Sequence, residues 1–269
     1  MLNPNEQFDA LSEDGKKRIL SSGLGSNINH SGLEFAVPLW WVFNDNESGI
    51  ALRNGSAFLV DFGQGVFAVT AAHVLREYSE AKRTAVAICC QLGNVLLDPE
   101  ERLIACRDDL DIATFRLDPS EVKQIGKSIA TLGPPNWELL NPTVGNFAFF
   151  AGFPAQSREM TPDGLAFVTA PYFATTPITS VTEHQIACRF DREKMIDFSG
   201  SGLPPVGYDI GGVSGGPMLI PTLVREGEPE GIVWRFAGVV VQASVGANVM
   251  FEQVVAVRGH YVHPDGKIG

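Results

Sequence analysis

The feature that most constrains the fold is a long succession of short apolar runs, each ended by Gly, Pro, Asn or Asp, that begins at Pro38. Runs of this length and spacing are typical of the strands of a β-sandwich or β-barrel. The first group of predicted strands covers 38–44, 55–62, 66–71, 84–92, 101–107 and 111–117. The stretch Gly63-Gln64-Gly65 predicts a hairpin turn, because glycine reaches the positive φ values that such turns need.

A second group of predicted strands follows a break in this pattern. Residues 118–144 lose the periodicity and contain four prolines, which marks a connector. The second group covers 145–152, 164–174, 182–190, 216–224, 234–243 and 249–258. Two groups of six strands predict an all-β fold of two packed six-stranded barrels. The first barrel would span 36–117 and the second 145–258, followed by a C-terminal tail over 259–269.

The first 35 residues differ from the rest of the chain. Phe8, Leu11, Ile19 and Leu20 stand among charged residues at roughly helical spacing, and a stretch rich in Ser and Gly follows. We expect a short amphipathic helix and a linker over 1–35. This extension is either solvated or a segment that packs or binds a partner.

The charge balance argues against one class of partner. The 269 residues include 20 Lys and Arg against 31 Asp and Glu, and the net charge of −11 repels phosphate backbones and anionic lipid. The N-terminus shows no signal-peptide pattern, and no apolar window reaches the roughly 18 residues of a membrane span. We therefore expect a cytoplasmic globular protein that binds neither nucleic acid nor membrane.

Four cysteines, Cys89, Cys90, Cys106 and Cys188, show no C-x-x-C spacing and are too few to staple a domain of this size. We expect buried thiols, as is common for free cysteine. A disulfide between the Cys89-Cys90 pair and Cys106 stays open as an alternative.

Three residues far apart in the sequence supply the groups that hydrolysis of an acyl bond needs. Ser214 offers a hydroxyl, which becomes a nucleophile when an imidazole accepts its proton. His73 offers that imidazole as general acid and base, and Asp111 offers a carboxylate that would hold the ring in the right tautomer. We predict that a cleft between the two barrels brings these three together.

The local sequence around each residue fits its role. The small residues Thr70-Ala71-Ala72 precede His73 at a predicted strand end, so little bulk stands beside the ring. Glycines flank Ser214 and allow the amides of Gly212 and Ser214 to converge on one point as an oxyanion hole. Asp109 is a second candidate for the orienting carboxylate, but Asp111 directly precedes the apolar strand and is favoured.

The blocks Thr70-Ala71-Ala72-His73, Asp111-Ile112-Ala113 and Gly212-Val213-Ser214-Gly215-Gly216-Pro217 resemble the three signature blocks of the trypsin/chymotrypsin-like serine peptidases, in that family's order. The stretch 145–154 resembles the first strand of the second barrel in bacterial members. The resemblance covers roughly 36–258. It implies two six-stranded Greek-key barrels with the active site between them, and cleavage of peptide bonds through an acyl-enzyme without a cofactor.

Departures from that family bear on regulation and specificity. Val213 stands where trypsin-type zymogens carry an Asp, which excludes activation through an N-terminal salt bridge. Tyr208 falls at the base of the expected specificity pocket, so a preference for Lys or Arg is not supported. Val241, Gln242 and Ala243 fall in the strand that resembles the pocket wall. Together these four residues imply a substrate-binding surface for small or medium uncharged side chains.

Two other kinds of site could be built from residues of this sequence, a nucleophile elbow at Ser214 and a metal site at His260 and His263. The serine block also satisfies G-x-S-x-G, the nucleophile elbow of α/β-hydrolases, which needs an acid and then a His after the serine. The only later Asp is Asp265, which follows His260 and His263, so this fold is rejected. The two histidines lie three apart without an evident third ligand, and we expect a solvated tail and no metal.

Two functions of different classes remain. The first is a serine endopeptidase acting on a polypeptide substrate. The second is a catalytically silent protease-fold module that binds peptides or partners. A cytoplasmic peptidase needs restraint, so the first function implies narrow specificity or gating, through residues 1–35 or a regulatory protein partner.

Overall fold

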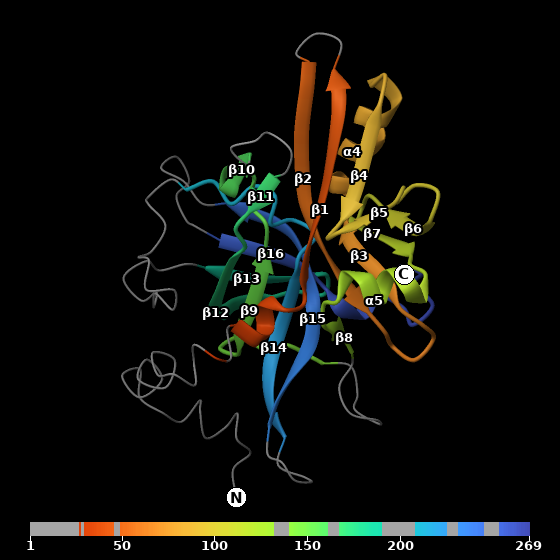
Figure 1. Ribbon diagram of the computed structural model, residues 1–269. Helices are drawn as coiled ribbons and strands as arrows, with labels where there is room; N and C mark the ends of the chain where they lie inside the picture. Colours follow the sequence, from red (N-terminus) through yellow and green to blue (C-terminus); the bar gives the residue numbers. More distant parts are fainter. Residues whose placement is uncertain are drawn as a thin grey trace, which may run out of the picture.

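The structure is a computed structural model, and it describes residues 27, 30–45, 49–131, 140–160, 167–189, 208–224, 231–244 and 253–269. These residues form a large sheet from the first half of the chain beside a closed barrel from the second half (Figure 1). The predicted all-β fold class is confirmed.

The first sheet is built around β1 (Ala36–Asp45) and β2 (Gly49–Val60), a long antiparallel pair that projects at the top of Figure 1. Val37, Leu39, Trp41 and Phe43 are buried at every second position of β1, because alternate side chains of a strand point to the same face. The strand order is β5-β4-β1-β2-β3-β7-β6, and β8 pairs in parallel with β2. The remaining strands are β3 (Phe67–Ala71), β4 (Ile88–Leu92), β5 (Val95–Leu96), β6 (Leu103–Arg107), β7 (Ile112–Arg116) and β8 (Ile129–Ala130).

One helix that the sequence analysis does not predict lies between two strands of this sheet. Helix α4 (Ala72–Thr84) begins directly after β3 and buries Val74, Leu75, Tyr78 and Ala81, which recur at helical spacing. His73 therefore stands in the first turn of a helix and not at a strand end. The predicted strand 84–92 is correspondingly shorter and is β4.

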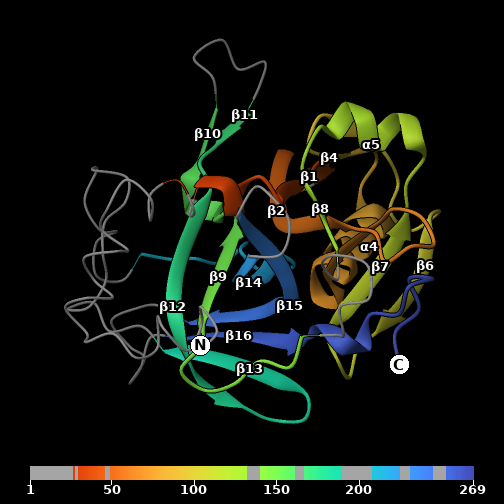
Figure 2. The ribbon, with the colours of Figure 1, turned by 90° about the horizontal axis from the view of Figure 1, so that it is seen from below.

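The second half forms the closed barrel β12-β13-β16-β15-β14-β9, which Figure 2 shows beside the first sheet. Its six strands confirm the predicted count. They are β9 (Phe147–Gly152), β12 (Tyr172–Val181), β13 (Gln185–Arg189), β14 (Pro217–Val224), β15 (Gly231–Ser244) and β16 (Gln253–Arg258). The predicted strand 164–174 divides between β12 and β11 (Phe167–Thr169), which pairs with β10 (Arg158–Met160) outside the barrel.

The two halves share one apolar core. Phe58 of β2 contacts Phe236 of β15 with ring centroids 5.3 Å apart, and the buried cluster around them joins Val60 of the first sheet to Val239 of the barrel. Burying each of these rings contributes about 1.5–3 kcal/mol. The sheet and the barrel are therefore packed as one body, and the groove between them has fixed walls.

The described parts of 118–144 and 259–269 contain structure that the sequence analysis does not predict. The connector 118–144 contains β8 and helix α5 (Pro119–Ile125), which starts with a capping box between Asp118 and Glu121. The segment 259–269 is not a solvated tail: Val262 and Ile268 are buried, and the carbonyl of Gly266 accepts a 2.5 Å hydrogen bond from Thr114 of β7. The prediction fails because two aliphatic residues in eleven give no periodic signal.

The cysteines are free thiols, and two of the four are buried. Burial raises the pKa of Cys188 to about 12 and also raises the pKa of Cys90. Cys89 and Cys106 are exposed, which corrects the expectation that all four are buried. No disulfide joins Cys106 to the Cys89-Cys90 pair.

Candidate active site

The pairing of β3 with β7 brings His73 and Asp111 together across 38 residues. Ala71, the last residue of β3, pairs with Ile112, the first residue of β7. The chain continues from β3 into α4 on one side and enters β7 from a turn on the other. The amide of Ala72 donates to the carbonyl of Asp111 at 3.1 Å, which fixes the two chain segments to each other.

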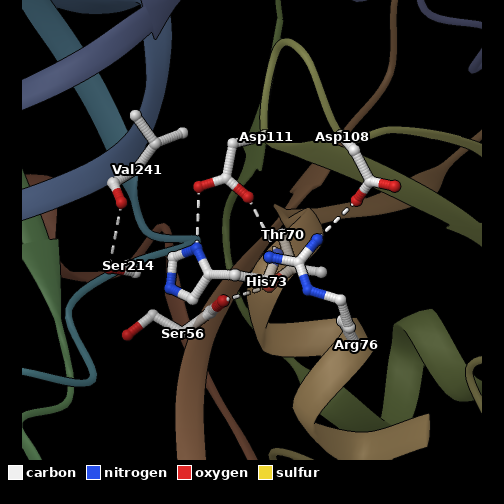
Figure 3. A network of polar contacts seen from close by, with 8 residues as sticks. All are labelled: Ser56, Thr70, His73, Arg76, Asp108, Asp111, Ser214 and Val241. Carbon is white, nitrogen blue, oxygen red and sulfur yellow. Dashed lines mark hydrogen bonds and ion pairs between the residues drawn. The ribbon is translucent and has the colours of Figure 1, made fainter.

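Asp111 contacts His73 at two points (Figure 3). Its Oδ2 lies 2.7 Å from His73 Nδ1, and its Oδ1 accepts the backbone amide of His73 at 2.8 Å. Both side chains are about three-tenths exposed, at 30% and 28%. Asp111 adopts φ 55°, a left-handed conformation that aspartate tolerates better than most residues. The turn thus aims the carboxylate at the imidazole.

Asp109, the other candidate for the orienting role, lies elsewhere. Its carboxylate forms a two-point pair with Arg107, at 2.7 and 2.5 Å. Asp108 is likewise paired with Arg76, as Figure 3 shows. Asp111 is thus the aspartate of this turn whose carboxylate contacts His73.

Ser214 lies on the same cavity as His73. The cavity has a volume of about 270 Å³, and Gly212 also lines it. The hydroxyl of Ser214 donates to the carbonyl of Val241 at 3.4 Å, a long and weak hydrogen bond. No hydrogen bond joins Ser214 to His73 within the described part of the chain. In Figure 3 the second ring nitrogen of His73 points away from Asp111.

The backbone around Ser214 leaves two amides available. Four neighbouring amides are already used: those of Gly211, Val213, Gly215 and Gly216 donate to Asp209 Oδ1 and to the carbonyls of Ile210, Val240 and Val213. The amides of Gly212 and Ser214 have no acceptor among the described residues. Gly212 has φ +101°, and a Cβ there would lie 2.7 Å from the carbonyl oxygen of Phe153. The turn therefore requires glycine at this position.

Ser56 of β2 connects this turn to the first sheet. Its hydroxyl donates to the carbonyl of Gly212 at 2.7 Å and accepts the amide of Phe153 at 2.8 Å. Its own amide donates to the carbonyl of Ser214 at 2.9 Å, and its carbonyl accepts the hydroxyl of Thr70 at 2.7 Å. The sequence analysis misses Ser56, although a serine inside an apolar strand already suggests a buried hydrogen-bonding role.

The predicted substrate-binding residues do not line the cavity that holds His73 and Ser214. Tyr208 contacts the hydroxyl of Ser157 and stacks on Tyr172 at 6.0 Å. Val241 offers its carbonyl to Ser214, Gln242 is exposed, and Ala243 packs against the barrel core. The cavity is lined instead by residues that sequence reasoning did not single out, namely Ala51, Leu52, Arg53, Asn54, Val74, Glu77, Ala155 and Arg158.

The described residues contain neither a metal-binding cluster nor a membrane-spanning helix. Within the described residues, no group of three or more His, Cys, Asp or Glu could hold a metal ion. His260 packs on the ring of Tyr261 at 4.1 Å, and burial beside Arg258 and His184 lowers its pKa. None of the helices in the described ranges has the length and apolar character to cross a bilayer.

The fold and the site together define an all-β protein in which a His-Asp pair and a glycine-flanked serine face one cavity. Among solved structures, the chain is similar to a thermostable serine protease from an extremophilic microorganism, with a TM-score of 0.44, 13% identity, and coverage of 85% of this chain and 92% of that chain. No family model and no curated protein matches the chain.

Proposed function

We propose that this chain is a serine endopeptidase that hydrolyses peptide bonds of a polypeptide substrate through an acyl-enzyme. One observation carries the proposal: His73, held at two points by Asp111, shares a cavity with Ser214 and Gly212. A carboxylate on Nδ1 fixes the tautomer in which the other ring nitrogen is free to accept a proton. That is the arrangement a serine nucleophile requires.

In the proposed reaction, the hydroxyl of Ser214 gives its proton to Nε2 of His73 and attacks the carbonyl carbon of the scissile bond. The oxygen that becomes negative is stabilised by the amides of Gly212 and Ser214, each worth about 2.7–4 kcal/mol in the transition state. His73 then protonates the leaving amine. Water, deprotonated by His73, hydrolyses the acyl-enzyme and restores Ser214.

The position of the Ser214 hydroxyl favours a second candidate function. Its hydrogen bond goes to the carbonyl of Val241 and not to His73. A chain that keeps this arrangement would bind peptides without cutting them. The endopeptidase proposal requires the hydroxyl to rotate toward His73, at the cost of one 3.4 Å hydrogen bond, which is weak.

A fluorophosphonate probe tests the proposal, because an activated serine displaces its fluoride and becomes phosphonylated. We expect labelling of the full chain, none of Ser214→Ala, and strongly reduced labelling of His73→Ala. Ser79→Ala is a matched control, since the Ser79 hydroxyl bonds to the carbonyl of Leu75 on α4. Equal labelling of the wild type and Ser214→Ala, or no labelling of either, would contradict the endopeptidase proposal and favour the peptide-binding function.

The remaining expectations are part of the same proposal. We propose a cytoplasmic location, a preference for small or medium uncharged side chains on the acyl side, and gating by residues 1–35 or a regulatory protein partner. Residues 1–26 lie outside the described residues. Deletion of 1–35 should change either the labelling rate of Ser214 or the oligomeric state. If it changes neither, residues 1–35 have no gating role.

A further inference from the structure

The cavity beside His73 and Ser214 contains two arginines. Arg53 lies on β2 and is exposed, whereas Arg158 begins β10 and is half-buried. Burial lowers the pKa of Arg158, and the positive charge of Arg53 on the same cavity lowers it further. In a chain with a net charge of −11, two cations therefore meet beside the candidate nucleophile.

These two charges have no carboxylate partner within the described residues. The guanidinium of Arg158 donates hydrogen bonds to two backbone carbonyls, those of Leu52 at 2.6 Å and Ala155 at 2.9 Å. Such bonds hold the guanidinium in place but leave its charge uncompensated. The carboxylate of Glu77 lines the same cavity from α4, is exposed, and forms no ion pair with either arginine. The cavity thus keeps a net positive charge.

The location of the cavity indicates which part of a peptide would enter it. Tyr208 and Val241–Ala243, the surface proposed for the acyl side, are not among its lining residues. Its walls come from β2, from α4 and from the segment 155–158. A peptide whose acyl part follows Val241–Ala243 would place the residues after the scissile bond here.

We propose that this cavity binds a carboxylate of the substrate on the leaving-group side of the scissile bond, through Arg53 and Arg158. The inference deepens the proposed endopeptidase function. It rests on that function, because the ligand of the cavity is a substrate only if the chain cleaves peptides. The carboxylate is that of an acidic side chain or of a free C-terminus. Guanidinium groups recognise both through paired, charge-assisted hydrogen bonds.

Binding to the full-length Ser214→Ala chain tests the site without relying on cleavage. Three four-residue peptides with a free N-terminus serve as leaving-group probes: one with Glu at its second position and an amidated C-terminus, one with Gln there and an amidated C-terminus, and one with Gln and a free C-terminus. We expect a carboxylate peptide to bind about tenfold more tightly than the neutral peptide in calorimetric titration. The tighter of the two carboxylate peptides identifies the source.

Four variants locate the effect. Arg53→Gln should remove most of the preference for the carboxylate, and because Arg53 is exposed this change leaves the packing intact. Arg158→Gln should do the same where the chain still folds. Glu77→Gln should instead strengthen binding, because it removes the one negative charge on the cavity wall. Arg83→Gln, an exposed arginine at the far end of α4 paired with Glu80, is the matched control and should change nothing.

A cleavage map of the wild-type chain on a peptide library provides the second readout. Acidic residues should be enriched at the second position after the cut, or the fragments released after the cut should be short C-terminal ones. Equal binding of all three peptides, or a preference that survives Arg53→Gln, overturns the inference even if Ser214 is labelled. Absence of labelling together with arginine-dependent carboxylate binding overturns the proposed function and leaves the carboxylate site standing.

Discussion

The hydroxyl of Ser56 donates to the carbonyl of Gly212 at 2.7 Å, across 156 residues of sequence. This hydrogen bond ties the turn that carries Ser214 to the strand β2 of the other half. The orientation of the Gly212 peptide group therefore depends on a side chain outside the barrel. The hydroxyl also satisfies the buried amide of Phe153.

Ser56→Ala should lower both the stability and the rate of Ser214 labelling. The change leaves the carbonyl of Gly212 and the amide of Phe153 without their partner, which costs about 1–3 kcal/mol per buried group. Urea unfolding measures the loss of stability, and fluorophosphonate labelling of the folded variant measures the rate. Ser79→Ala is the comparison. A variant that labels at the wild-type rate would show that the turn holds its shape without Ser56.

Asp111→Asn should reduce the labelling rate by about 10³–10⁴-fold with little loss of stability. Asparagine accepts the amide of His73 as aspartate does and tolerates a φ of 55°, but its NH₂ group favours the wrong tautomer of the ring. Asp111→Ala should lower the melting temperature as well, because alanine is strained in the left-handed region. Asp109→Asn, which alters the pair with Arg107 and leaves His73 untouched, is expected to label normally.

Gly212→Ala should abolish labelling of Ser214. A Cβ at this position would meet the carbonyl oxygen of Phe153 at 2.7 Å, and the positive φ adds strain, so the turn must move. Gly63→Ala separates the two effects, since Gly63 has φ +97° with nothing within 4 Å of the added Cβ. It should cost about 1 kcal/mol of stability and leave labelling unchanged. Equal labelling of Gly212→Ala and wild type would remove Gly212 from the proposed oxyanion hole.

Thr114→Val should destabilise the protein without touching the site. The Thr114 hydroxyl is buried and bonds to the carbonyl of Gly266 at 2.5 Å. Valine keeps the shape and removes the donor, leaving a carbonyl unsatisfied at a cost of about 1–3 kcal/mol. Urea unfolding gives the magnitude. Thr84→Val, at an exposed helix end, is the control, and an equal effect of both would show that the bond to Gly266 contributes nothing.

Asp98→Asn should destabilise the protein near neutral pH and have less effect in acid. Burial acts to raise the pKa of Asp98, but hydrogen bonds from Lys82 and from the amides of Glu100 and Glu101 lower it overall. A lowered pKa means that the stabilisation is present above the unfolded value of about 3.9 and is lost as the pH falls through the folded value. Urea unfolding of both proteins between about pH 7 and pH 2 should show the two curves converging. A constant difference would contradict this assignment.

The all-β fold could be predicted because most strands here carry their own signal. Apolar runs separated by turn residues require only local information, and β1 adds an alternation of buried positions. Helix α4 was not predicted, because a helix of about three turns between two strands gives only a short periodic signal. Its buried residues nevertheless stand at helical spacing, namely Val74, Leu75, Tyr78 and Ala81. The packing of Val262 and Ile268 could not be predicted at all, since it depends on where β7 lies.

The candidate site divides in the same way. The local sequence around His73, Asp111 and Ser214 is sufficient to single these residues out. The pairing of β3 with β7 then brings the first two into contact. Ser56 and the arginine pair have no such block. Their roles arise from contacts with residues about a hundred or more positions away, such as Ser56 with Gly212 or Arg158 with Leu52. Single-sequence reasoning finds residues whose chemistry is local and misses those defined by the tertiary structure.

The contact between Gly266 and Thr114 also sets an order of events during synthesis. β7 is made early, yet part of the cover over its sheet is supplied by residues 262–268, more than a hundred positions later. The ribosome must release those residues before the first sheet can complete its packing. The cavity beside His73 is likewise incomplete until Gly212 and Ser214, its last lining residues in the sequence, have been made.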